Sequence, residues 1–142
     1  MKSRKLGNGT VLIFDTGDEV VSTLTAFARQ NHIAAAHFTA IGAFSDAGLG
    51  YFDLQKKDYL KNQVNEQVEV VSLIGDIALD KGEPKVHAHV VVGRKDGSTM
   101  GGHLLEAHVR PTLELILLDS GEQLKRKFDP ESGLALIDLG QQ

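Results

Sequence analysis

The sequence has 142 residues, about the length of one domain that buries a hydrophobic core without disulfides. It contains no cysteine, which excludes disulfides, thiolate metal ligands and a cysteine nucleophile, and leaves histidine and carboxylate side chains as candidate ligands. Fifteen basic and nineteen acidic residues give a net charge of -4, whereas proteins that bind nucleic acid mainly through phosphate contacts usually carry a basic stripe.

The N-terminal segment is basic but lacks the apolar run of a signal peptide, because Gly7, Gly9 and Asp15 interrupt it. No stretch of the chain approaches the roughly 18 apolar residues of a membrane-spanning helix. We therefore expect a cytoplasmic protein with no membrane partner. A solvated surface is the simpler interpretation of the short basic clusters Lys2-Arg4-Lys5, Lys56-Lys57-Lys61 and Lys125-Arg126-Lys127.

The first predicted elements are a short strand over residues 11–15 and a helix over residues 18–31. Thr16, Gly17 and Asp18 form a turn that leads into the helix. Asn31 is the expected C-cap. The apolar residues of the helix lie on one stripe, as expected of a helix that rests on a sheet: Val20, Val21, Leu24, Phe27 and Ala28.

The rest of the chain is predicted to form strands separated by short turns. Turn residues at Asp80-Lys81-Gly82, Lys95-Asp96-Gly97 and Ser120-Gly121 suit hairpins between antiparallel strands. One helix and many strands predict an α+β fold, in which the main amphipathic helix covers one face of a largely antiparallel sheet or barrel. We expect a single domain over residues 1–142, with a frayed tail at residues 138–142. The predicted strands cover residues 35–41, 44–54, 59–61, 67–79, 85–93, 99–105, 112–118 and 134–139.

Two histidines are predicted to lie on one face of a strand. Residues 85–93 alternate as a strand does, so His87 and His89 point to the same side, about 6.6 Å apart by the rise of a strand. Taken alone, such a pair is more often a pair of core or surface histidines than a pair of metal ligands.

The loop after this strand fixes a register. Lys95-Asp96-Gly97 fits a three-residue hairpin loop with glycine at the position that needs a left-handed conformation. With Arg94 opposite Ser98, His103 lies directly across from His89 and on the same face. A two-residue loop or a bulge before His103 would turn this side chain elsewhere.

We interpret His87, His89 and His103 as ligands of a divalent metal ion. Cross-strand neighbours have Cβ atoms about 4.5–5.5 Å apart, a span that an ion with bonds of about 2.0–2.1 Å can bridge. Three nitrogen ligands leave a position open for water or substrate, as in catalytic zinc sites. Zinc is the favoured ion, with iron, nickel and manganese as alternatives. A set of core or surface histidines is the competing interpretation.

Glu114 is the candidate catalytic residue, because a carboxylate inside an apolar strand needs a partner. It could orient a metal-bound histidine or act as a general base. An outward-facing charge or a salt bridge with Arg110 is the alternative, and Glu106 is similarly ambiguous. The remaining histidines lack such partners and are interpreted as structural, the last of them with a reserve role as a ligand: His32, His37 and His108.

Motifs spread over nearly the whole chain form a recognisable set. They are Gly17-Asp18, Ala40-Ile41-Gly42-Ala43, Leu49-Gly50-Tyr51-Phe52-Asp53, Val86-His87-Ala88-His89, Asp96-Gly97, Gly101-Gly102-His103-Leu104, and Glu114 in the strand after Pro111. By these motifs the chain resembles the plants-and-prokaryotes conserved (PPC) domain family, whose domain is also found joined to AT-hook motifs in plant nuclear proteins.

The resemblance implies an antiparallel sheet with a packed helix, assembled as a homotrimer. It also implies that His87, His89 and His103 are metal ligands near a subunit boundary. A further implication is DNA binding, but the chain contains no Arg-Gly-Arg-Pro core of an AT-hook, so that device for minor-groove insertion is absent from it.

The sequence is compatible with three functions. The first is a metal-dependent small-molecule binder or hydrolase, in which the ion activates water or polarises a carbonyl. The second is a DNA-binding or regulatory homotrimer whose metal is structural, a reading that the net charge opposes. A protein-interaction module that tolerates loss of the histidines is a third. The sequence leaves open the substrate and whether the protein is an enzyme.

Overall fold

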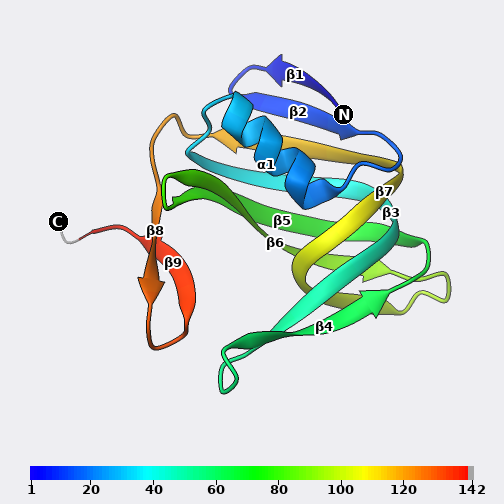
Figure 1. The fold of residues 1–142 in the computed structure, drawn as a ribbon. Coiled ribbons are helices and arrows are strands. Elements are labelled where there is room, and N and C mark those ends of the chain that lie inside the picture. Colours follow the sequence, from blue (N-terminus) through cyan, green and yellow to red (C-terminus); the bar gives the residue numbers. More distant parts are fainter. Residues whose placement is uncertain (141–142) are drawn as a thin grey trace.

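The computed structural model describes residues 1–140, which form one helix and nine strands (Figure 1). In this part of the chain no helix is long and apolar enough to cross a membrane. Of the tail predicted to fray, Asp138 is the last residue of a strand, and residues 141–142 lie outside the described residues. The elements are β1 (Lys2–Leu6), β2 (Gly9–Phe14), α1 (Val20–Gln30), β3 (Ala35–Asp53), β4 (Asp58–Val64), β5 (Val68–Asp80), β6 (Glu83–Gly93), β7 (Thr99–Asp119), β8 (Lys125–Asp129) and β9 (Leu134–Asp138).

The predicted α+β fold class is wrong, because strands make up 66% of the described residues and helix only 8%. The fold is mostly β. The helix has 11 residues, whereas β3 and β7 have 19 and 21. Strands β1 and β8 were not predicted at all, since both are dominated by Lys and Arg and lack the apolar alternation on which a strand prediction depends.

Each of the two longest strands replaces two predicted ones. We expected a break at Gly42 and another between residues 105 and 112, but the strands stay paired through register shifts at these points. Gly42 has a φ of 152°, and a Cβ at this position would collide with the carbonyl of Thr112 on β7. Glycine therefore permits a close approach of β3 to β7 instead of ending the strand.

All nine strands belong to one sheet in the order β1-β2-β7-β3-β5-β8-β9, with β4 on β3 and β6 paired to both β5 and β7. Among the described residues every pairing is antiparallel except a single parallel pair between Leu79 and Lys125. Because β6 pairs with two partners, the path β7-β3-β5-β6 returns to β7 and closes one end of the sheet. That closed end carries the β6–β7 hairpin with the three histidines.

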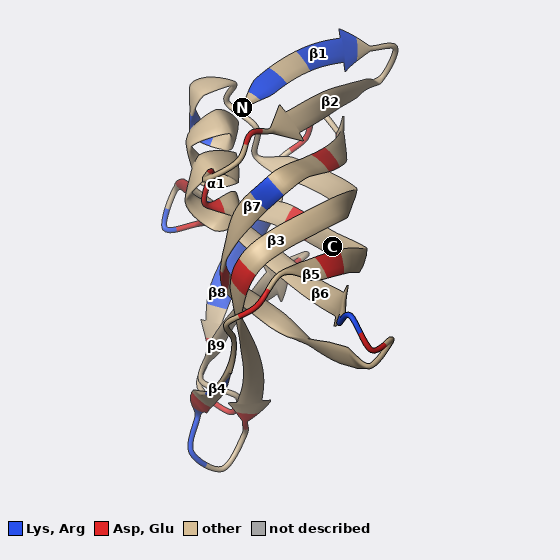
Figure 2. Cartoon of the chain, turned by 90° about the vertical axis from the view of Figure 1, so that its right-hand side faces the viewer, with Lys and Arg blue, Asp and Glu red and all other residues tan. Residues whose placement is uncertain are grey.

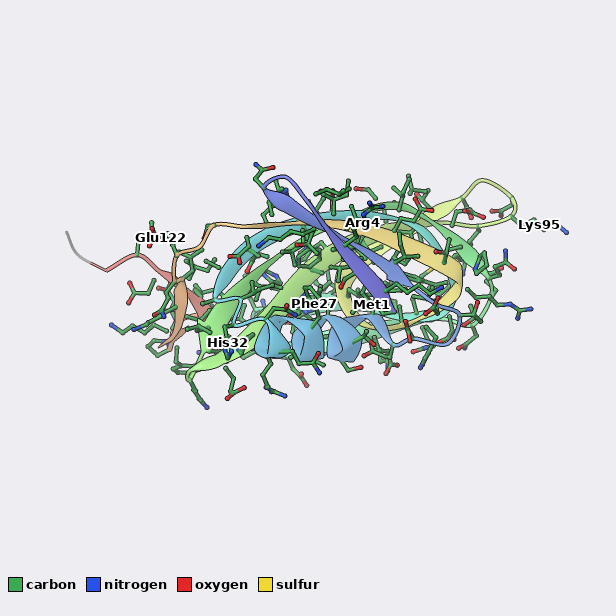
Figure 3. The ribbon with its side chains drawn as sticks, turned by 90° about the horizontal axis from the view of Figure 1, so that it is seen from above. Met1, Arg4, Phe27, His32, Lys95 and Glu122 are labelled. Carbon is green, nitrogen blue, oxygen red and sulfur yellow. The ribbon has the colours of Figure 1, made fainter. Side chains whose placement is uncertain are left out.

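Helix α1 lies along one face of the sheet (Figures 1 and 3). Glu19 caps its N-terminus, because the carboxylate accepts hydrogen bonds from the backbone N–H groups of Val21 and Ser22. The predicted C-cap, Asn31, is confirmed. Each large apolar side chain that the helix buries stabilises the fold by about 1.5–3 kcal/mol. Those in the core are Val20, Leu24 and Phe27, with Ala28 beside them.

The strands leave large apolar side chains exposed on the sheet face opposite the helix, which we call the outer face. Side chains on a strand alternate between the two faces, so these residues cannot join the core under α1. An exposed apolar patch of this extent usually marks a binding surface. Its members lie on β3, β5, β6 and β7: Ile41, Val71, Ile74, Val91, Ile116 and Leu118.

Candidate metal centre

The β6–β7 hairpin has the register that its loop predicts. The N–H of Arg94 donates to the carbonyl of Ser98 at 2.8 Å, and the N–H of Gly97 donates to the carbonyl of Arg94 at 2.9 Å. Gly97 is left-handed, with a φ of 83°. His89 pairs directly with His103. The predicted three-residue loop and the predicted position of His103 are therefore confirmed.

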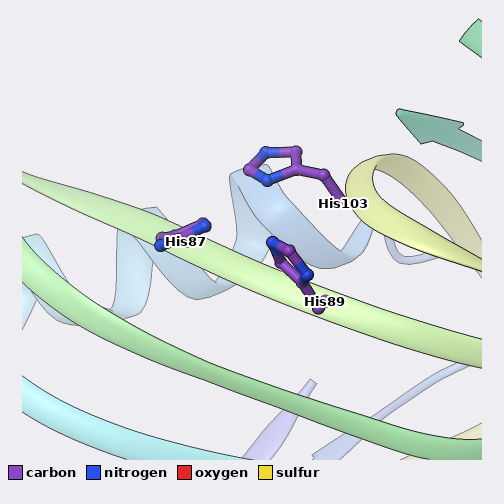
Figure 4. Close-up of side chains that lie close together, drawn as sticks. All are labelled: His87, His89 and His103. Atoms are coloured by element: carbon purple, nitrogen blue, oxygen red, sulfur yellow. The ribbon is translucent and has the colours of Figure 1, made fainter. Parts of the chain in front are cut away.

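The side chains of His87, His89 and His103 converge at the base of this hairpin. The ring centroid of His87 lies 5.2 Å from that of His89 and 5.1 Å from that of His103, and the centroids of His89 and His103 are 5.5 Å apart. One potential ligand nitrogen from each ring lies within 4.8 Å of the others. Figure 4 shows a ring nitrogen of each histidine facing the space that they share. Tetrahedral zinc places its nitrogen ligands about 3.3 Å apart, so small side-chain rotations close this group on an ion.

The protonation states of the cluster suit metal binding. Burial, followed by the charges of His87 and His89, lowers the pKa of His103 to about 4. Burial also lowers the pKa of His89, with a further contribution from His87. His89 and His103 are therefore neutral near pH 7, which is the form that binds a metal ion.

His103 supplies a direct test of whether these residues fit a metal ion. Its Nδ1 is buried and has no hydrogen-bond partner in the part of the chain that the structure describes. A buried nitrogen without a partner costs roughly 1–3 kcal/mol. An ion between the three rings supplies the missing partner, so the donor set fits a divalent metal.

Two glycines let an aromatic ring pack against His103. Gly50 on β3 pairs with His103, and a Cβ on Gly50 would lie 2.6 Å from the ring of Tyr59. A Cβ on Gly102 would lie 2.8 Å from the carbonyl oxygen of Gly50. With both Cβ atoms absent, the Tyr59 and His103 ring centroids are 4.8 Å apart. Close backbone approach and packing together fix the orientation of His103.

A carboxylate that we did not predict lies beside the cluster. Asp76 on β5 pairs with His87 on β6, and its Oδ2 lies 3.4 Å from the Nδ1 of His87. The guanidinium of Arg126 on β8 donates to the other oxygen of Asp76. Burial raises the pKa of Asp76, but the interaction with His87 and the charge of Arg126 outweigh burial and lower it. The ionised Asp76 can orient His87 and leave its Nε2 free for an ion.

The sequence did contain a signal for Asp76. Lys81 and Gly82 have φ values of 53° and 88°, as a two-residue hairpin turn of type I′ requires, and Asp80 pairs with Glu83 across this turn. The turn was recognised from the sequence, but its register was not followed along the strands. Counting four residues back from Asp80 and four forward from Glu83 places Asp76 opposite His87.

Glu114 lies on the outer face and outside the histidine cluster. It is exposed and pairs with Ile41 on β3. Going across the sheet from His89 on β6, the strands β5 and β3 come before the part of β7 that carries Glu114. This path crosses three strand spacings of about 4.8 Å, so Glu114 is on the order of 15 Å from His89. Within residues 1–140 no ion pair joins Glu114 to Arg110. Its catalytic role stays a prediction.

The other candidate side chains have partners of their own. The ammonium of Lys61 lies 2.6 Å from Glu106, and the Nδ1 of His108 lies 2.8 Å from Asp46. His108, the reserve ligand, is therefore not brought into the cluster. His32 follows the helix in a left-handed conformation. His37, in contrast, lines an open cavity of ≈ 390 Å³ on the outer face together with Asp76, His87 and His89.

Comparison with known sequences gives a family match and one curated relative. The sequence model of the family described as the Plants and Prokaryotes Conserved (PCC) domain matches residues 1–120. The bifunctional protein GlmU of Synechococcus sp. (strain JA-3-3Ab) is 35% identical over 120 residues, which cover 82% of this chain. The matched region spans only 18% of the length of that relative.

Solved structures match over nearly the full chain. The metal-containing protein AF0104 from Archaeoglobus fulgidus is 39% identical, with a TM-score of 0.86 and 94% of each chain covered. A protein from Bacteroides thetaiotaomicron, described as a candidate DNA-binding protein, is 31% identical, with a TM-score of 0.93 and 96% of each chain covered. These matches cover more of the chain than the 120 residues of the family model.

Proposed function

This chain belongs to the Plants and Prokaryotes Conserved domain family, and we propose that it binds one divalent metal ion, zinc, through His87, His89 and His103. The observation that carries the proposal is the convergence of the three imidazoles, with the buried Nδ1 of His103 left without a partner in the described chain. The similarity to a protein described as metal-containing supports it. Zinc suits three nitrogen ligands and a carboxylate in the position of Asp76.

The ion makes a small-molecule binder or hydrolase the best-supported activity. An ion held by three imidazoles polarises a carbonyl or lowers the pKa of a bound water. The residues of this chain bind and orient: Asp76 fixes the ring of His87, and Tyr59 packs on His103. Whether Glu114 takes part depends on a second subunit, because it lies too far from the histidines of its own chain.

Elemental analysis of the purified protein tests the metal site. Protein prepared without chelators should contain about one divalent ion per chain, and His89→Ala should remove it. The control is His32→Ala, which removes an exposed histidine outside the cluster and should keep the ion. A wild-type protein without metal, or a His89→Ala variant that retains it, would overturn the proposal.

We further propose that the protein is a homotrimer and that the outer face forms the subunit interface. The exposed apolar residues of this face include Ile41, Ile74 and Ile116, and they lie next to the cavity lined by His87 and His89. Ile116→Lys should therefore reduce the molar mass measured by light scattering to that of a monomer. A monomeric wild type, or a variant with unchanged molar mass, contradicts this interface.

DNA binding is the second candidate function. Figure 2 shows that Lys and Arg positions make up much of the ribbon of β1, and these three residues are exposed: Lys2, Arg4 and Lys5. The similarity to a candidate DNA-binding protein also favours this function, whereas the net charge of -4 opposes it. Fluorescence anisotropy titrations with duplex DNA test whether the protein binds DNA. Binding that falls steeply with salt and is lost when the three β1 cations become Gln would support DNA binding, and no binding near physiological salt would contradict it.

A further inference from the structure

A small cavity separates the histidine cluster from the C-terminal hairpin β8–β9. Its volume is ≈ 80 Å³, enough for a few water molecules or a compact ligand. We call it the hairpin cavity. The rings of two cluster histidines form part of its wall, so a ligand inside would lie next to the metal site. Residues that line the hairpin cavity include Tyr59, Lys85, His87, His103, Arg126 and Leu134.

The ionisable side chains that line the hairpin cavity are cationic or neutral. Lys85 and Arg126 carry positive charge, and among the described residues no carboxylate lines the cavity. The side chain of Arg126 is only 6% exposed. Its guanidinium donates to the carbonyl of Ala135 and to Asp76, while its Nε is buried and has no hydrogen-bond partner within residues 1–140. Tyr59, which also lines the cavity, carries a hydroxyl that can donate a hydrogen bond.

The charges around the hairpin cavity favour an anionic ligand only when the metal ion is bound. Lys85 lies 3.5 Å from Asp80, and Arg126 is paired with Asp76, so these four side chains sum to zero. With neutral imidazoles, a divalent ion then leaves the loaded site with an uncompensated charge of +2. In a half-buried site such a charge strongly favours an anionic ligand.

The remaining wall of the cavity is apolar. Leu134 and Ala135, both half-buried, come from β9, and Val86 comes from β6. An inorganic oxyanion would leave this wall in contact with water or with charge. A short aliphatic acid places its carboxylate toward the cations and its hydrocarbon part against the wall.

On the basis of the proposed metal site, we propose that the hairpin cavity binds the carboxylate of a small organic acid beside the ion. Arg126 is the fixed countercharge, because Asp76 and Ala135 hold its guanidinium in place. Lys85 and Tyr59 are the donors nearest to solvent. The β8–β9 hairpin therefore selects the ligand, while the β6–β7 hairpin holds the metal.

Calorimetry with matched probes tests this inference. Propionate and propionamide have the same shape and differ in charge, and inorganic phosphate serves as the oxyanion without an apolar part. Zinc-loaded protein should bind propionate at least tenfold more tightly than either of the other two, and chelator-treated protein should bind none of them. Arg126→Gln should weaken propionate binding at least tenfold, and Lys127→Gln, on the same strand but outside the cavity, should not.

The metal content of every sample is measured before titration, so the two proposals fail separately. A wild type that does not load with metal overturns the proposed function. A loaded wild type that binds propionate no better than propionamide, or that prefers phosphate, overturns only the carboxylate site. If Arg126→Gln does not fold, Lys85→Gln takes its place, with the turn residue Lys81→Gln as its control. Unchanged propionate affinity in Lys85→Gln then contradicts the site.

Discussion

Asp76→Asn should weaken zinc binding by 10- to 100-fold without removing a metal ligand. Two full charges 3.4 Å apart at an effective dielectric constant of about 20 interact by about 5 kcal/mol. This is an upper limit, because a metal-bound imidazole carries only part of a charge and Arg126 neutralises the same carboxylate. Loss of a carboxylate partner behind a histidine ligand typically costs 10- to 100-fold in affinity, or about 1.4–2.7 kcal/mol, which lies within this limit.

Competition with a chromophoric chelator measures this loss. Asp80→Asn is the matched control, because Asp80 lies on the same strand and pairs with Lys85 instead of a histidine. It should bind zinc as the wild type does. The free energy of unfolding of both metal-free variants separates a local effect from a loss of stability, since Asp76→Asn also leaves the buried Arg126 without its counterion. Equal zinc affinity in wild type and Asp76→Asn would refute the orienting role of Asp76.

Four further outcomes are expected. Gly97→Ala strains a left-handed residue, and no atom of residues 1–140 lies within 4 Å of the added Cβ. Denaturant unfolding should therefore show a loss of about 1 kcal/mol in the free energy of unfolding at unchanged zinc affinity. Gly102→Ala sets a Cβ 2.8 Å from the carbonyl oxygen of Gly50 and should lower both stability and affinity. The hydrogen bond that His108 donates to the carboxylate of Asp46 raises the pKa of His108. This exposed pair therefore adds a few tenths of a kcal/mol to the stability below pH 6.5, and the contribution is lost as the pH rises through the folded-state pKa. An NMR titration of His108 should give a pKa above 6.5 that returns toward 6.5 in Asp46→Asn, and equal values in both proteins contradict the pairing. Chelation of the metal should lower the thermal unfolding midpoint but leave the far-ultraviolet circular dichroism unchanged, because backbone pairing of the strands holds the site together.

The histidine cluster could be predicted from the sequence because its geometry is local. Alternation along β6 puts His87 and His89 on one side, and a loop with one left-handed glycine sets the partner of His89. Strand alternation and the loop register both act within the stretch from His87 to His103. The same kind of rule, applied to the turn at Lys81-Gly82, would also have found Asp76.

The fold class could not be obtained in this way, because it depends on contacts between distant segments. A bulge and a strand end have the same signature in sequence: a glycine, or a run without alternation. At Gly42 only the approach of Thr112, 70 residues later in the chain, decides that the strand continues. Arg126 was missed for a related reason. It lies in a basic cluster that suggested a solvated surface, and its burial depends on the packing of β8 against β5.

The core of the protein fixes the register of the histidine cluster. On β6 the buried residues Ala88, Val90 and Val92 alternate with His87, His89 and Val91 on the other face. A slip of one residue between β6 and its neighbours would expose the two valines and bury both histidines. Loss of the valine burial alone costs about 1.5–3 kcal/mol per side chain, before the cost of burying imidazoles. Hydrophobic packing under α1 therefore selects the single register in which His89 faces His103, although none of these core residues belongs to the histidine cluster.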